Sequence, residues 1–156
     1  MTISEIDAVT CEVRIAATPE VVFGFFTDPH KMLRWMGTAA ELDVRPGGAY
    51  WININGADVA RGSFVELVPF SRIVLSWGWD GADAPVPPGS TTVEVTLTPD
   101  DDGTHLRLVH RGLALAQVRD AHRDGWQHYL ERLAIAAPGG EPGPDPHAKT
   151  EGSSKQ

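Results

Sequence analysis

The feature that most constrains the fold of this chain is an apolar and aromatic stripe near its C-terminal end. Steps of three or four residues separate seven side chains: Leu115, Val118, His122, Trp126, Tyr129, Leu133 and Ala137. This spacing places all seven on one face of a long helix. Gly125 lies among them, although glycine costs about 1 kcal/mol relative to alanine inside a helix. We therefore interpret the helix as one wall of a cavity that can hold a partly polar molecule.

Composition and charge narrow the classes of protein to consider. Of the 156 residues, 42% are hydrophobic and 22% are charged, as in an ordinary globular domain with one sizeable core. The net charge of −8 and the lack of a basic run argue against nucleic acid as a partner. No apolar stretch approaches the roughly 18 residues of a membrane span, and the first ten residues lack the pattern of a secretory signal. We expect a cytoplasmic protein with no membrane span.

Alternating apolar and polar residues predict antiparallel strands before the helix. Val9–Ile15 is predicted to be a half-buried strand, with the single cysteine, Cys11, as a small buried side chain. Two short helices are expected next, because Thr18-Pro19-Glu20 and Asp28-Pro29 contain the residues that favour helix starts. About six more strands are predicted, at residues 40–45, 50–54, 59–68, 72–79, 92–97 and 105–111.

Together these elements predict one α+β domain over residues 1–137. Only one face of each strand is apolar, so a curved antiparallel sheet of about six to seven strands must wrap around the C-terminal helix. Residues 138–156 contain no large apolar side chain and cannot offset the entropy of their own ordering. They are predicted to form a disordered C-terminal tail.

Two details of the sheet bear on which side chains reach its interior. Tyr50, Ile52 and Ile54 are the expected inner face of their strand, while the orientation of Trp51 is ambiguous from the pattern. Residues 81–89, with the sequence GADAPVPPG, have neither helical nor strand character. They are predicted to form an exposed loop.

Several segments resemble one known superfamily in their order and spacing. They are residues 17–23 (ATPEVVF), Thr27-Asp28-Pro29, Trp35, residues 45–48 (RPGG), residues 62–66 (GSFVE), Trp77-Gly78-Trp79, residues 103–106 (GTHL), and the later His122, Gly125, Trp126, Leu130 and Leu133. Between residues 8 and 136 the chain resembles the START-like (SRPBCC, birch-pollen-allergen-like) superfamily, and within it the branch named after the activator of the Hsp-90 ATPase.

The resemblance implies a helix-grip fold with a deep pocket between the sheet and the C-terminal helix. In the superfamily such pockets hold lipids, hormones, polyketides and other apolar molecules, and some members are cyclases or hydroxylase subunits. The branch takes its name from a eukaryotic co-chaperone, but the resemblance does not extend to that protein's separate N-terminal domain. We therefore do not expect a chaperone contact.

Two histidines are the candidates for polar or catalytic roles in the predicted pocket. His110 ends the inner face of the last strand, where it is either a ligand contact or a core histidine whose hydrogen bonds are made within the protein. His122 lies one helical turn from Trp126, as a polar point in an aromatic wall or as part of a packing cluster. The full set of predicted ligand-binding residues is Phe26, Trp35, Trp77, Trp79, Leu97, Leu108, His110, His122, Trp126, Tyr129 and Leu133.

The sequence lacks the motifs of metal, nucleotide and nucleophilic chemistry. It has no HExxH or CxxC spacing, no GxSxG elbow, and no GxGxxG or Walker pattern. We therefore expect no metal and no cofactor. Proton transfer by His110 or His122 is the one catalytic possibility that remains.

Three functions remain open from the sequence. The leading hypothesis is a module that binds a small hydrophobic molecule between the sheet and the helix. The alternative is an enzyme of the polyketide cyclase or dehydratase kind, with His110 and His122 as proton-transfer groups. The third is a chaperone-interaction module that acts through its outer surface. The sequence also leaves a homodimer open.

Overall fold

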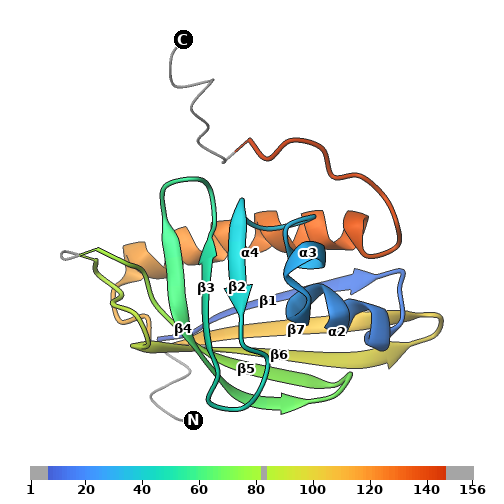
Figure 1. Cartoon of the computed structure of the whole chain (residues 1–156), viewed down its shortest axis with the longest axis horizontal. Helices are drawn as coiled ribbons and strands as arrows, with labels where there is room; N and C mark the ends of the chain where they lie inside the picture. Colours follow the sequence, from blue (N-terminus) through green and yellow to red (C-terminus); the bar gives the residue numbers. More distant parts are fainter. Residues whose placement is uncertain (1–6, 82–83, 147–156) are drawn as a thin grey trace.

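The computed structural model describes residues 7–81 and 84–146, and within them one antiparallel sheet of seven strands forms the centre (Figure 1). The strands lie in the spatial order β1-β7-β6-β5-β4-β3-β2. Their bounds are β1 Val9–Ile15, β2 Ala39–Leu42, β3 Ala49–Asn53, β4 Val59–Val68, β5 Arg72–Trp77, β6 Thr91–Asp100 and β7 Gly103–Arg111. The predicted α+β class and strand number are confirmed.

Three helices accompany the sheet in the described part of the chain: α2 (Pro19–Thr27), α3 (Pro29–Met32) and the long α4 (Ala116–Ala136). Figure 1 shows the sheet curving around α4, which packs along β1, while α2 and α3 lie together at one end. The predicted stripe of α4 turns inward and buries Trp126, Tyr129 and Leu133. Leu115 is the exception: it is the N-cap residue, lies outside the helix and is 55% exposed.

The short helices begin where the sequence predicts, because side chains bond their first backbone N–H groups. The Thr18 hydroxyl accepts a hydrogen bond from the Val21 N–H at 3.3 Å, and Pro19 occupies the first helical position. Asp28 ends α2 and also caps α3, since its carboxylate accepts from the His30 N–H at 2.9 Å. The chain therefore turns sharply from one helix into the next.

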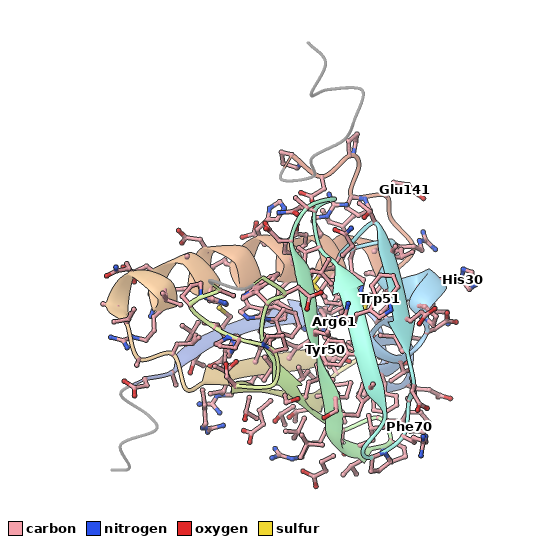
Figure 2. All side chains as sticks on the ribbon, turned by 60° about the vertical axis from the view of Figure 1, so that its left-hand side comes forward. His30, Tyr50, Trp51, Arg61, Phe70 and Glu141 are labelled. Atoms are coloured by element: carbon pink, nitrogen blue, oxygen red, sulfur yellow. The ribbon has the colours of Figure 1, made fainter. Side chains whose placement is uncertain are left out.

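The alternation of β3 separates an inner from an outer face. Tyr50 and Ile52 are 2% and 1% exposed, and Ile54 just beyond the strand is also buried, as predicted. Trp51, left ambiguous by the pattern, lies on the outer face opposite Arg61 of β4 (Figure 2). Its indole N–H donates to Glu41 on β2 at 3.2 Å. Trp51 is thus a surface side chain of the sheet.

The predicted loop at residues 81–89 is exposed only in part. Val86 is 4% exposed and belongs to the hydrophobic core. Its carbonyl oxygen accepts a hydrogen bond from the Trp79 backbone N–H at 2.7 Å. The loop therefore folds back onto the continuation of β5, which the prediction of a wholly exposed loop missed. Residues 82–83 of this segment lie outside the described residues.

The segment after α4 returns along the domain without regular secondary structure as far as residue 146 (Figure 1). Glu141 forms an ion pair with Arg34 at 3.4 Å, at the end of the molecule opposite Phe70 (Figure 2). The Asp145 carboxylate accepts hydrogen bonds from His128 at 2.8 Å and from the Tyr129 hydroxyl at 2.6 Å. The rest of the predicted tail, residues 147–156, lies outside the described residues.

Candidate functional site

A cavity of about 240 Å³ lies between the middle of α4 and the end of β5 with its continuation through Trp79. Five aromatic or imidazole rings of these two elements face it, and the turns after α3 and β3 complete the wall. The lining residues are Met36, Ile54, Asn55, Trp77, Trp79, Ala121, His122, Gly125, Trp126 and Tyr129. No acidic residue, lysine or arginine is among these described residues, so the wall is aromatic and uncharged.

Gly125 keeps the space in front of α4 open. A Cβ atom added at this position would meet no heavy atom within 4 Å. The glycine therefore exposes the helix backbone to the cavity, at a cost of about 1 kcal/mol in helix propensity. A small residue therefore lies beside His122 and Trp126 of the stripe, in the middle of the helix and in the lining of the cavity.

A chain of three hydrogen bonds runs through the wall behind the cavity. The Trp126 indole N–H donates to His110 Nδ1 at 3.1 Å, and His110 Nε2 lies 2.8 Å from the Thr91 hydroxyl. The Thr91 hydroxyl donates to the Trp77 carbonyl at 2.8 Å. Since Nδ1 accepts from the indole, the proton of a neutral His110 must lie on Nε2 and donate to Thr91. The bonds fix one tautomer and engage both ring nitrogens.

His122 has the opposite tautomer. Its Nδ1 lies 2.8 Å from the Val118 carbonyl oxygen, which can only accept, so the proton is on Nδ1. Its Nε2 accepts from the Trp79 indole N–H at 3.0 Å. Both ring nitrogens of this histidine are therefore also engaged by the protein, and each histidine carries a tryptophan N–H on its accepting nitrogen.

Burial keeps both histidines uncharged. His110 is 0% exposed, and its desolvation, together with the nearby His122, lowers the pKa of His110 to about 3. Desolvation also lowers the pKa of His122, against the opposing effect of its bond to the Val118 carbonyl. The two imidazole rings lie 5.0 Å apart, centroid to centroid, so a charge on either would be unfavourable for the other. At neutral pH the wall therefore carries no positive charge.

The tryptophan rings pack as a cluster around this pair. Trp77 lies 5.0 Å from Trp126 and 5.7 Å from Trp79, the latter edge to face at 89°. The Trp77 indole N–H is buried and has no hydrogen-bond partner among the described residues. Tyr129, at the other side of the cavity, is bonded to Asp145, and burial and this carboxylate raise the pKa of its hydroxyl.

The structure brings together five of the predicted ligand-binding residues and places a sixth directly behind them. Trp77, Trp79, His122, Trp126 and Tyr129 line the cavity, and His110 bonds to the wall from within the core. The others are buried elsewhere in the core, outside the lining: Phe26, Trp35, Leu97, Leu108 and Leu133.

Five lining residues are outside the predicted ligand-binding set: Met36, Ile54, Asn55, Ala121 and Gly125, of which only Gly125 was singled out from the sequence, as a small residue in the helix. The first three belong to turns, where no periodicity reports which way a side chain points. Ala121 lies one residue before His122 and is too small to be distinguished from an ordinary helix surface position. Of the three turn residues, Ile54 alone had a signal in the sequence, since the alternation of residues 50–54 directs its side chain inward.

The described residues offer no metal centre. Within residues 7–81 and 84–146, no three His, Cys, Asp or Glu side chains come together as a metal ion would require. The same part of the chain has no helix long and apolar enough to cross a membrane.

The curved sheet, the long helix that it holds and the aromatic cavity between them define a START-like domain of the helix-grip type. The chain belongs to the Activator of Hsp90 ATPase homolog 1-like family, whose model matches residues 16–137. The family assignment made from the sequence segments is thereby confirmed.

Individual relatives agree with this assignment. The AHSA1-like protein of Rhizobium etli is 50% identical, with a TM-score of 0.72 over 92% of this chain and 89% of that one. The Activator of 90 kDa heat shock protein ATPase homolog 1 of Homo sapiens is 27% identical over 125 residues, which are 77% of this chain. The chain spans 35% of that human protein and 32% of a relative from Schizosaccharomyces pombe.

The fold also occurs in a protein of the dynemicin biosynthetic locus. That protein, DynU16, is 23% identical to this chain, with a TM-score of 0.76 over 87% of this chain and 49% of that one. At this level of identity the likeness concerns the fold alone.

Proposed function

We propose that this protein binds a small apolar or aromatic molecule in the cavity between β5 and α4. The observation that carries the proposal is the cavity itself: about 240 Å³, walled by three tryptophans, a tyrosine and an uncharged histidine. Ligand sites are concave and mostly apolar, with few polar groups.

The hydrogen bonds of the two histidines favour binding over cyclase chemistry. A general base needs a free lone pair directed at the substrate, and a general acid needs a proton that it can release there. On His110 and His122, both lone pairs and both protons are engaged by Trp126, Trp79, Thr91 and the Val118 carbonyl. Neither ring is available for proton transfer without first breaking a bond inside the wall.

A matched pair of variants tests the proposal. Gly125→Leu puts a side chain into the open space in front of α4, whereas Asp124→Leu adds the same group on the exposed side of the helix. We expect Gly125→Leu to weaken binding of 2-methylnaphthalene, measured by equilibrium dialysis, by at least about tenfold, since the ligand and the leucine compete for one space. Asp124→Leu should bind as the wild type does.

Native mass spectrometry of freshly purified protein complements the dialysis. A discrete excess mass that is lost on denaturation would identify a natural ligand, and Gly125→Leu should lack it. If the wild-type protein binds no aromatic probe and carries no such mass, the binding function is refuted.

Interaction with an Hsp90 chaperone is a second candidate, favoured by the family match and by the name of the human relative. Such a function would act through the outer surface and would not need the cavity. Stimulation of Hsp90 ATPase activity by the wild type and equally by Gly125→Leu would support it. Lack of any stimulation, with ligand binding retained, would exclude it.

A further inference from the structure

Every polar side chain that lines the cavity, with one exception, is already bonded to the protein. The Asn55 amide group bonds to Asp58, and its oxygen accepts from two backbone N–H groups. The Tyr129 hydroxyl donates to Asp145. Trp126 donates to His110, and Trp79 donates to His122. The exception is the Trp77 N–H, whose nitrogen is itself buried, so that an acceptor reaches it only if the ring moves.

The Trp79–His122 bond matters most for a ligand, because both residues line the cavity. His122 Nε2 is a strong acceptor, and without Trp79 it would face the cavity unpaired. The indole N–H covers it at 3.0 Å and presents the apolar ring in its place. His110 Nδ1 is covered in the same way by Trp126, but deeper in the wall.

We propose that Trp79 is a specificity-determining residue that masks the His122 acceptor and thereby restricts the ligand class. This inference rests on the proposed binding function and names the ligands that the cavity admits. They are uncharged, flat aromatic molecules whose buried part carries no hydrogen-bond donor. A hydroxyl or amine pressed against the part of the wall formed by Trp79, His122 and Trp126 finds no acceptor and loses its bonds to water. A carboxylate finds no counter-charge, and the N–H groups of a protonated amine lose their bonds to water without an acceptor in this part of the wall.

The size of the cavity limits how large a ring system it can bury. An apolar cavity of about 150 Å³ is large enough to hold benzene, so 240 Å³ admits a two-ring aromatic molecule with a small substituent. Ring faces of Trp77, Trp79 and Trp126 suit stacked and edge-on contacts with such a molecule. A naphthalene carrying one substituent is therefore the appropriate probe.

Two isosteric probes test the mask: 2-methylnaphthalene and 2-naphthol, which differ by a methyl group against a hydroxyl. In the wild type, 2-naphthol should bind at least about fivefold more weakly by equilibrium dialysis, because its hydroxyl is buried without an acceptor. Trp79→Phe removes the indole N–H and leaves His122 Nε2 free. The affinity ratio of 2-naphthol to 2-methylnaphthalene should then rise about 5- to 10-fold.

A double variant identifies the acceptor. Trp79→Phe combined with His122→Leu has no free imidazole nitrogen, so the gain for 2-naphthol should disappear. Comparing a ratio of two probes within each protein cancels any general change of cavity size. The ionised probe 2-naphthoate should bind none of the three proteins measurably.

The outcomes separate this inference from the function on which it rests. If 2-methylnaphthalene does not bind the wild type, the binding function fails and the inference with it. If that probe binds but the wild type favours 2-naphthol, or the ratio is unchanged in Trp79→Phe, the mask alone is refuted. The wild-type comparison decides the question even if a variant does not fold.

Discussion

Lowering the pH from 6 to 4.5 should reduce the free energy of unfolding by about 2 kcal/mol through His110 alone. In the folded protein, desolvation and the neighbouring His122 lower the pKa of His110 to about 3, whereas in an unfolded chain it is near 6.5. Between these values the unfolded chain binds a proton that the folded protein does not. The contribution of His110 to the free energy of unfolding is therefore fully present above about pH 6.5 and is lost progressively as the pH falls toward 3.

The magnitude follows from the two pKa values. Each pH unit inside the window is worth about 1.4 kcal/mol for one group, and the window covers nearly all of the interval from pH 6 to 4.5. His110 is fully buried, so solvent does not screen the effect. His122, whose pKa is also lowered, adds to the loss with the same sign.

A nontitrating variant isolates the contribution of His110. Urea unfolding of the wild type and His110→Gln, followed by tryptophan fluorescence at several pH values, gives both free energies. His110→Gln should be less stable than the wild type at pH 7, since glutamine cannot reproduce both bonds of the ring. The gap should narrow by about 2 kcal/mol between pH 6 and 4.5. If the difference in stability between the two proteins stays constant with pH, His110 has the same pKa in the folded and the unfolded protein. That result would refute a neutral ring held by two hydrogen bonds.

Three further predictions concern the neighbouring contacts. Thr91→Val keeps the shape of the side chain but leaves the His110 Nε2–H unpaired. The free energy of unfolding, measured in urea, should fall by about 1–3 kcal/mol. No change would mean that Thr91 and His110 are not hydrogen-bonded. Burial raises the pKa of the Cys11 thiol. Iodoacetamide should therefore label this thiol slowly in the folded protein and quickly in urea. Equal labelling rates in the two conditions would contradict the burial of Cys11. Tyr129→Phe removes the bond to Asp145 and should speed protease cleavage within residues 138–146, whereas Tyr50→Phe should not.

Much of the fold could be predicted because alternation and helical period report burial directly. The inner positions of β3 and the stripe of α4 lie where their patterns place them. Leu115 was wrongly placed on the helix because the spacing of apolar residues extends to the residue before the helix begins. Such a pattern does not report where the backbone hydrogen bonds of the helix start. Val86 was missed because an isolated apolar residue in a Pro-rich loop has no period at all.

The site was predictable in its residue types but not in its pairings. Periodicity directed His122 and Trp126 inward, and the last strand did the same for His110. That each histidine accepts from a tryptophan on another element depends on how far α4 slides along the sheet, which no local pattern encodes. Because of these hydrogen bonds with tryptophan, the two histidines are buried parts of the wall and not free proton-transfer groups.

The strand order has a consequence for how the chain is made. Of the seven strands of this sheet, β1 leaves the ribosome first and its partner β7 last, with Val9 opposite His110. Until residue 111 is synthesised, β1 lacks its partner strand and its apolar face stays in solvent, while β2 through β6 can pair as local hairpins. Such distant pairing slows folding, because a long loop must close before its contacts form. We expect the nascent chain to expose this face for several seconds at common rates of synthesis, about 5–20 residues per second. During that time β1 can pair with another chain, so it is open to aggregation while the protein is being made.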